Sequence, residues 1–253
     1  MNDVHPPPLT ADVALFLDFD GTLVDIAPSP NAVRVAPGLH ELMAQVAWHL
    51  NGALAVITGR PIETIDKHLK GTVRAVAGIH GAERRTSLGH VIHAEIPASM
   101  LDGARETLSV FCRANPGVRA EDKGLSIALH FRAVPDLGPA CRRIVDECAA
   151  ASHGQLERLD GNMVVELKPI NVKKAAAMSA YMNEPPFAGR RPVFVGDDLT
   201  DESAFVAVSQ TNGYGVIVGA RTPTAATTRL PTVAALHAWL TTLNEQNDGR
   251  TAP

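Results

Sequence analysis

An apolar run that ends in two acids, at residues 14–22, constrains the fold of this chain more than any other feature. It reads Ala-Leu-Phe-Leu-Asp-Phe-Asp-Gly-Thr, which predicts a short buried strand followed by a tight turn at Gly21. Because side chains alternate along a strand, Asp18 and Asp20 are expected to lie near each other at its end. Two such carboxylates can hold a hard cation such as Mg²⁺, or one can attack phosphorus while the other transfers a proton. Taken alone, the stretch also fits an ordinary strand end before an Asp-Gly turn.

Composition indicates an ordinary globular protein. The chain has 253 residues, of which 45% are hydrophobic, enough for one large domain or two small ones. A net charge of -4 and only 4% aromatic residues argue against a nucleic-acid partner. Three cysteines without metal-ligand spacing predict reduced thiols and a cytoplasmic location. No signal peptide, no membrane span and nothing beyond a monomer is expected.

Two segments in which strands and helices alternate predict a parallel sheet that is covered on both faces. Between them, three hairpin-like segments interleaved with two helices predict a small inserted α+β domain. The expected core comprises residues 1–83 and 170–253, and the expected insert comprises residues 84–169. The predicted strands are 15–17, 53–57, 73–79, 193–195 and 215–218, the hairpins 83–95, 118–132 and 156–167, and the helices 37–46, 61–69, 99–114, 135–152, 173–182 and a last one from 232.

Further polar groups fall at the ends of predicted core strands or at the helix starts beside them, where open parallel sheets bind ligands. Thr58 and Gly59 follow the second strand, and a hydroxyl with free amides at a helix start suits a phosphate oxygen. Thr58 could equally cap the next helix. Lys174, or its neighbour Lys173, begins the helix after the insert. A buried ammonium there would neutralise phosphate charge, whereas a solvated one would have no such role.

The segment Gly196-Asp197-Asp198-Leu199-Thr200-Asp201 completes the predicted site. Asp197 directly ends an apolar strand, where a carboxylate is costly unless a cation or hydrogen bonds offset it. Asp201 could orient Lys174 or a metal-bound water. Together these groups predict phosphoryl transfer, in which Asp18 attacks in line to form an aspartyl-phosphate. Asp20 would protonate the leaving alcohol and then deprotonate the attacking water.

These motifs resemble the four motifs of the haloacid dehalogenase superfamily phosphatases. Further segments resemble the trehalose-6-phosphate phosphatase family in particular, and they run over almost the whole chain. They are Thr58-Gly59-Arg60, Gly78-x-His80-Gly81-Ala82-Glu83-Arg84-Arg85, Ala128-Leu129-His130-Phe131-Arg132, Val164-Val165-Glu166-Leu167-Lys168-Pro169 and Pro192-Val193-Phe194-Val195-Gly196-Asp197-Asp198-Leu199-Thr200-Asp201-Glu202.

The resemblance implies an α/β fold, with a Rossmann-like parallel-sheet core and an inserted α+β cap domain that is mobile. It implies a Mg²⁺-dependent hydrolase that converts trehalose 6-phosphate to trehalose and phosphate in trehalose biosynthesis. The implied catalytic residues are Asp18, Asp20, Thr58, Lys174 and Asp201, and the implied metal ligands are Asp18, Asp197 and the main-chain carbonyl of Asp20. The implied substrate contacts are Asp18, Asp20, Gly59 and Arg60 in the core and Glu121, Lys123 and Glu166 on the sugar.

The chain departs from the family pattern after Pro169. Asn171 and Lys174-Ala175 stand where such sequences usually carry Gly and Lys-Gly, and register favours Lys174 over Lys173 as the site lysine. Other functions left open are a phosphatase for another sugar phosphate, a catalytically silent regulatory partner of the synthase, and a phosphomutase. A phosphomutase would need a second phosphate site, and no further basic cluster marks one.

Overall fold

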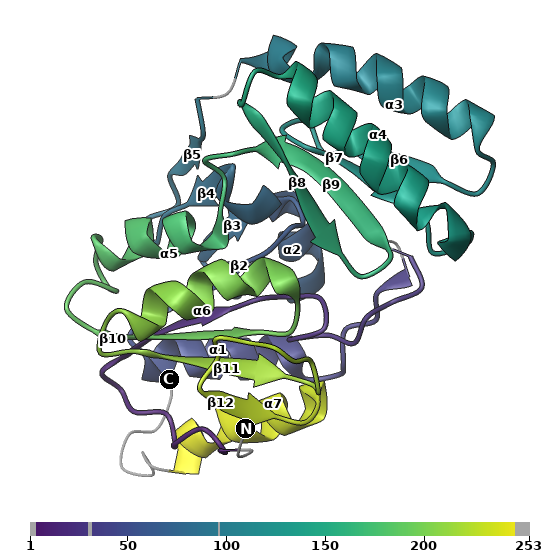
Figure 1. The fold of residues 1–253 in the computed structure, drawn as a ribbon. Helices are drawn as coiled ribbons and strands as arrows, with labels where there is room; N and C mark the ends of the chain where they lie inside the picture. Colours follow the sequence, from purple (N-terminus) through teal and green to yellow (C-terminus); the bar gives the residue numbers. More distant parts are fainter. Residues whose placement is uncertain (1–3, 30–31, 96, 246–253) are drawn as a thin grey trace. The chain divides into compact units, whose positions relative to one another are not determined.

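The structure is a computed structural model, and it describes residues 4–29, 32–95 and 97–245 (Figure 1). The chain forms two compact units. Met1–His93 together with Lys174–Pro253 make up the first, called the core unit here, and Ala94–Lys173 make up the second, called the cap unit. Among the described residues, no helix is both long and apolar enough to span a bilayer.

The core unit is built on an eight-stranded sheet with the strand order β12-β11-β10-β1-β2-β3-β4-β5. The pairs from β12 to β3 are parallel, and β4 and β5 are added antiparallel at one edge. The strands are β1 (Val13–Leu17), β2 (Leu54–Ile57), β3 (Ala75–Gly78), β4 (Glu83–Arg85), β5 (Val91–His93), β10 (Arg191–Gly196), β11 (Tyr214–Val218) and β12 (Thr228–Leu230).

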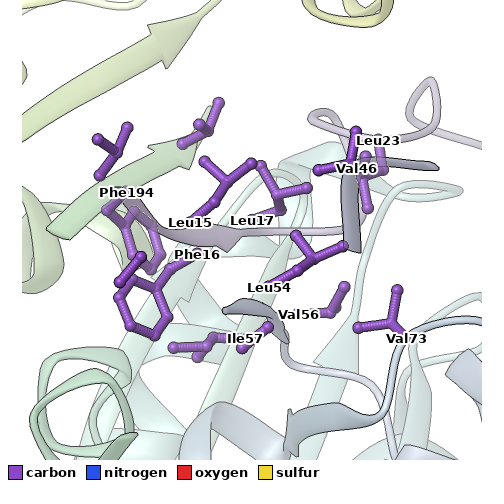
Figure 2. Close-up of a cluster of buried hydrophobic side chains, with 14 of the residues drawn as sticks. Leu15, Phe16, Leu17, Leu23, Val46, Leu54, Val56, Ile57, Val73 and Phe194 are labelled. Carbon is purple, nitrogen blue, oxygen red and sulfur yellow. The ribbon is translucent and has the colours of Figure 1, made fainter. Parts of the chain in front are cut away.

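Strand β1 lies inside the sheet, and all five of its residues are fully buried. Leu15 and Leu17 point to one side of the strand and Phe16 to the other (Figure 2). The Phe16 ring stacks on Phe187, with 5.5 Å between ring centroids, and on Tyr181 at 6.2 Å. Because both faces of β1 are covered, its sequence is continuously apolar rather than alternating.

Helices cover both faces of the core sheet (Figure 1). Helix α5 packs against α6, and α1 packs against α7. A connection through a helix keeps successive strands parallel, so the carboxyl ends of β1, β2 and β10 share one edge of the sheet. The helices are α1 (Leu39–His49), α2 (Ile62–Leu69), α5 (Lys174–Met182), α6 (Glu202–Ser209) and α7 (Val233–Glu245).

The hairpin formed by β4 and β5 belongs to the core sheet. Strand β4 pairs with β3, and Arg84 forms a two-pronged ion pair with Glu184 at 2.8 and 2.9 Å. The compact units divide after residues 93 and 173, whereas the domain limits expected from the sequence are 83 and 169. Sequence pattern identified the hairpin but could not show which sheet it extends, because a hairpin has the same alternation in either place.

The cap unit is a four-stranded antiparallel sheet with the order β6-β7-β9-β8 and two long helices. Apolar residues of one sheet face pack with α3 and α4, and Leu108, Leu129 and Val145 are fully buried there. The elements are α3 (Asp102–Ala114), β6 (Arg119–Asp122), β7 (Ile127–His130), α4 (Gly138–Ala151), β8 (Leu156–Gly161) and β9 (Val164–Pro169).

Candidate active site

Three carboxylates gather at the carboxyl edge of the core sheet. Asp18 follows β1 and Asp197 follows the adjacent strand β10, and Asp201 lies four residues further along the chain. One oxygen from each carboxylate lies within 4.8 Å of the others. Asp18 and Asp201 are buried, so their charges need partners inside the protein.

Lys174, the first residue of α5, lies against two of these acids. Its Nζ is 2.9 Å from Oδ1 of Asp18 and donates a hydrogen bond to Oδ1 of Asp201 at 2.6 Å. The lysine is only 2% exposed. Lys173 instead has its Nζ 4.0 Å from a carboxylate oxygen of Glu157 and a half-exposed side chain. The structure therefore places Lys174, and not Lys173, among the acids.

The site carries an excess of negative charge. Burial and the neighbouring carboxylate of Asp201 outweigh the opposing ammonium of Lys174 and raise the pKa of Asp197 to about 7. Burial also raises the pKa of Asp18 well above its usual value, against the ammonium of Lys174. Burial alone would lower the pKa of Lys174, but Asp18 and Asp201 outweigh burial and raise it. One ammonium among three carboxylates leaves room for a further cation.

Asp201 is committed to protein groups through both oxygens. Oδ1 accepts from Lys174, and Oδ2 accepts from the main-chain N–H groups of Asp197 and Asp198 at 3.0 Å each. Gly196 makes this possible, because a Cβ at that position would lie 2.3 Å from Cγ of Asp201. The oxygens left to hold a metal ion are therefore those of Asp18 and Asp197.

The carboxylate of Asp197 sits against Gly21, in the turn after β1. A Cβ at Gly21 would lie 2.1 Å from Oδ2 of Asp197, and the φ of Gly21 is 80°. Oδ1 of Asp197 accepts a hydrogen bond from the Thr22 hydroxyl at 3.0 Å. The Gly-Thr pair of the first motif thus has a steric and a hydrogen-bonding function toward the acid of the last one.

Asp20 faces a different partner from Asp18. Its carboxylate takes two bonds from Arg60, with Nε 2.5 Å from Oδ2 and Nη2 2.7 Å from Oδ1. The main-chain N–H of Arg60 donates to the hydroxyl of Thr58 at 3.2 Å. The segment after β2 thereby connects to the turn after β1.

Thr58 and Gly59 lie between β2 and α2. Thr58 is 1% exposed, and its main-chain N–H donates to the carbonyl of Ala77 at 2.9 Å. The carbonyl of Thr58 accepts a hydrogen bond from the main-chain N–H of His80 at 2.8 Å. A Cβ at Gly59 would lie 2.9 Å from the His80 ring. Gly59 is therefore required where the buried His80 side chain approaches the main chain closely.

The predicted sugar-binding residues lie together in the cap unit. Glu121 of β6 pairs across the sheet with Ala128 of β7, which pairs with Glu166 of β9, so the two carboxylates share one face. Lys123 donates to Oε2 of Glu166 at 2.9 Å, and Glu121 is 2.7 Å from Nε2 of His130. The His130 hydrogen bond holds the pKa of Glu121 below its usual value, against burial and with help from Lys123.

Two partners of this group carried no site prediction. His130 follows Ala128 by two residues and therefore shares its face, a relation that the alternation of the predicted hairpin 118–132 already contained. Arg105 of α3 donates to Asp122 at 2.7 Å and to the carbonyl of Gly124 at 2.8 Å. It supports the turn that bears Lys123, and no local sequence pattern reveals that contact.

The chain has a haloacid dehalogenase-like fold. The fold matches a solved haloacid dehalogenase-like hydrolase from Bacteroides thetaiotaomicron with a TM-score of 0.65, at 15% identity over 92% of this chain and 98% of that one. The chain belongs to the trehalose-phosphatase family, whose model matches residues 16–233.

One protein of known sequence and one solved structure are similar over most of the chain. The chain is 37% identical to a trehalose-6-phosphate phosphatase of Escherichia coli over 236 residues, which cover 92% of this chain and 87% of that protein. The solved C-terminal domain of the Candida albicans trehalose-6-phosphate phosphatase has the same fold, with a TM-score of 0.83, 20% identity and coverage of 92% and 93%. The predicted fold class, the predicted family and the predicted phosphatase activity are confirmed.

Proposed function

We propose that this chain hydrolyses trehalose 6-phosphate to trehalose and inorganic phosphate through an aspartyl-phosphate on Asp18. One observation supports this most directly: a buried carboxylate that follows the central strand lies 2.9 Å from a buried ammonium and beside a second strand-end acid. This arrangement presents a nucleophile and a charge-neutralising group to a single phosphoryl group.

The first half-reaction transfers the phosphoryl group to the protein. A carboxylate oxygen of Asp18 attacks phosphorus in line, and the bond between phosphorus and the sugar oxygen breaks. Asp20 donates its proton to that leaving oxygen, so trehalose departs as a neutral alcohol. Lys174 neutralises charge on the phosphoryl oxygens, and Asp201 holds the ammonium in place through its 2.6 Å hydrogen bond.

The second half-reaction restores the protein. Asp20, now ionised, takes a proton from water as the water oxygen attacks phosphorus. The bond between phosphorus and Asp18 breaks, which releases inorganic phosphate and the free carboxylate. Arg60 orients Asp20 through its two-pronged contact. Thr58 and the main-chain amide of Gly59 supply further donors to the phosphoryl oxygens.

Mg²⁺ fits the donor set that remains after Lys174 and Asp201 have paired. Asp18 and Asp197 offer hard carboxylate oxygens, the ligands that Mg²⁺ prefers, and the main-chain carbonyl of Asp20 is the third proposed protein ligand. The raised pKa of Asp197, about 7, indicates a carboxylate that gains from a neighbouring cation. When bound, Mg²⁺ would act as a Lewis acid toward the phosphoryl oxygens.

The sugar specificity is assigned to Glu121, Lys123 and Glu166. Two carboxylates and an ammonium on one sheet face can hydrogen-bond to the hydroxyl groups of a sugar. A substrate without those hydroxyl groups would leave the three side chains without these bonds, so it would bind less well. The cap unit is the proposed sugar-reading domain, and cap closure over the substrate remains part of the proposal. A cytoplasmic location and a monomeric state also belong to it. The described free thiols Cys112, Cys141 and Cys148 support that location.

A substrate panel tests this proposal. Purified protein with Mg²⁺ is offered trehalose 6-phosphate, glucose 6-phosphate, glucose 1-phosphate and p-nitrophenyl phosphate, and released phosphate is measured. We expect a clear preference in kcat/KM for the disaccharide phosphate. Equal turnover of glucose 6-phosphate would identify a broader sugar phosphatase, and absence of any release would identify a silent regulatory partner.

A further inference from the structure

Arg221 and Glu202 form an ion pair that has no part in the proposed reaction. Arg221 follows β11, Glu202 begins α6, and Nη2 of Arg221 donates to Oε1 of Glu202. Both side chains are about three-quarters buried, at 25% and 22% exposure. Burial works against ionisation of Glu202, but hydrogen bonds from the Ala225 N–H and from Arg221 outweigh it and lower the pKa of Glu202.

The pair holds its own loop together. Oε2 of Glu202 accepts from the main-chain N–H of Ala225 at 2.8 Å, and Nη1 of Arg221 donates to the carbonyl of Pro223 at 3.0 Å. The guanidinium is therefore fixed by a carboxylate on one side and by its own loop on the other. The planar guanidinium of Arg221 is hydrogen-bonded on two sides, so its orientation is restricted.

The third nitrogen of this guanidinium donates to the proposed metal ligand. Nε of Arg221 donates to the main-chain carbonyl of Asp197 at 3.2 Å. On the other side of the residue, the N–H of Asp197 donates to Asp201 at 3.0 Å. Asp197 is thus held through its carbonyl by Arg221, through its amide by Asp201 and through its carboxylate by Thr22.

We propose that Arg221 is a positioning residue for Asp197, and that Glu202 keeps Arg221 in the orientation this requires. The inference rests on the proposed function, because it concerns how that function's metal ligand is placed. Loss of a group that orients a metal ligand typically costs about 10- to 100-fold in metal affinity or activity. Arg221 contacts neither the substrate nor the reacting atoms in this proposal.

The test measures Mg²⁺ binding without substrate. Thermal unfolding of the full chain is followed while Mg²⁺ is titrated, for the unsubstituted protein, Arg221→Gln, Arg221→Lys and Glu202→Gln. The dissociation constant for Mg²⁺ is fitted from the dependence of the unfolding temperature on Mg²⁺ concentration, and it is called the Mg²⁺ midpoint here. We expect it to rise about tenfold in Arg221→Gln and Glu202→Gln. At saturating Mg²⁺, the KM for trehalose 6-phosphate should stay unchanged.

Arg190→Gln is the matched control, because Arg190 also donates to main-chain carbonyls of the core unit, at Ala11 and Val13, but not at the site. Its Mg²⁺ midpoint should equal that of the unsubstituted chain. If Arg221→Gln does not fold, Arg221→Lys, which keeps the charge and the aliphatic stem, provides the measurement. The double substitution Arg221→Gln/Glu202→Gln should lose no more affinity than either single one.

The outcomes separate the inference from the proposed function. If Arg221→Gln lowers the unfolding temperature but keeps the Mg²⁺ midpoint, the residue is only structural and the inference is wrong. If the unsubstituted chain shows neither Mg²⁺ stabilisation nor phosphate release, the proposed function fails and takes the inference with it. A raised midpoint with unchanged substrate KM supports both.

Discussion

Arg60 donates two hydrogen bonds to the carboxylate of Asp20, from Nε to Oδ2 at 2.5 Å and from Nη2 to Oδ1 at 2.7 Å. The arginine side chain is 14% exposed and the aspartate 35%, so the contact is partly shielded from water. The pair fixes a carboxylate that the proposed mechanism uses to transfer a proton. An acid or base must lie within hydrogen-bonding reach of the atom it serves, so its orientation matters as much as its charge.

Replacing Arg60 with lysine should therefore reduce turnover. Lysine keeps the positive charge but cannot hold a carboxylate with two parallel bonds. We expect kcat for trehalose 6-phosphate to fall about 10- to 100-fold while the Mg²⁺ midpoint stays constant. Steady-state kinetics and the Mg²⁺ melting titration measure the two quantities. An unchanged kcat would show that Asp20 needs no help from Arg60.

Asp18→Asn should remove activity by more than about a thousandfold, because the proposed nucleophile is lost. Phosphate release measures the loss. Mass spectrometry of acid-quenched enzyme should detect a phosphorylated peptide containing residue 18 in the unsubstituted chain and none in the variant. Glu106→Gln, at an exposed position of the cap unit, is the control with full activity. Residual turnover in Asp18→Asn close to that of the control would exclude the aspartyl-phosphate.

The metal-free protein should lose stability as the pH rises from about 5 to about 8. Asp197 has its pKa raised to about 7 by burial, and the pKa of Asp18 is raised well above its usual value by burial as well. The folded chain therefore binds more protons than the unfolded chain above about pH 4, where free carboxyls ionise. The stabilisation is complete below that pH and is lost as pH rises through the folded pKa.

Unfolding temperatures measured in chelator across that pH range test this expectation. Asp197→Asn should show a flatter profile, because one of the responsible carboxyls is gone. Added Mg²⁺ should stabilise most at the alkaline end, where the carboxylates are ionised. A metal-free protein that becomes more stable with rising pH would contradict the assigned direction.

Glu121→Gln should affect the sugar and spare the chemistry. Glutamine is a weaker hydrogen-bond acceptor than glutamate for a hydroxyl group of the sugar, so kcat/KM for trehalose 6-phosphate should fall about 10- to 100-fold. Turnover of p-nitrophenyl phosphate, which offers no sugar hydroxyls, should change little. Kinetics with both substrates measure the split, and Glu106→Gln again serves as the control. Equal losses on both substrates would place Glu121 outside sugar recognition.

Gly21→Ala should abolish the metal response. The new Cβ would lie 2.1 Å from Oδ2 of Asp197, so the carboxylate must move. Gly71→Ala is a close control, since Gly71 also has a positive φ, 68° against 80°, but its Cβ would meet nothing within 4 Å. Both variants should lose about 1–2 kcal/mol from backbone strain, measured by denaturant unfolding. Mg²⁺ stabilisation that persists in Gly21→Ala would contradict the role assigned to this contact.

Much of the fold follows from patterns that are local in the sequence. The apolar runs near residues 15, 54 and 193 became β1, β2 and β10, and the three predicted hairpins formed. The short strand β12 at Thr228–Leu230 escaped prediction, because three residues are too few to show a period. The sheet to which β4 and β5 belong depends on tertiary pairing with β3, which no local pattern encodes.

The site was predictable where its residues follow core strands. Asp18 and Asp197 meet because the ends of adjacent parallel strands share an edge of the sheet, and Lys174 reaches Asp18 from the start of α5. The pairing of Asp20 with Arg60 was not predictable, because it depends on where two loops meet. The same is true of Arg221, whose contact with Asp197 spans 24 positions of the chain.

The order of strands in the core sheet has a consequence for how the protein is made. Strand β1 pairs with β10, and the Thr22 hydroxyl donates a hydrogen bond to Asp197, which lies 175 positions later in the chain. Residues 94–173 form a compact unit of their own, contiguous in the sequence. During synthesis on a ribosome, residues 94–173 can fold first. Strand β1 cannot pair with β10 until β10 has been translated. A nascent chain released between residues 173 and 201 would therefore contain the whole middle unit and lack the phosphate-transfer centre.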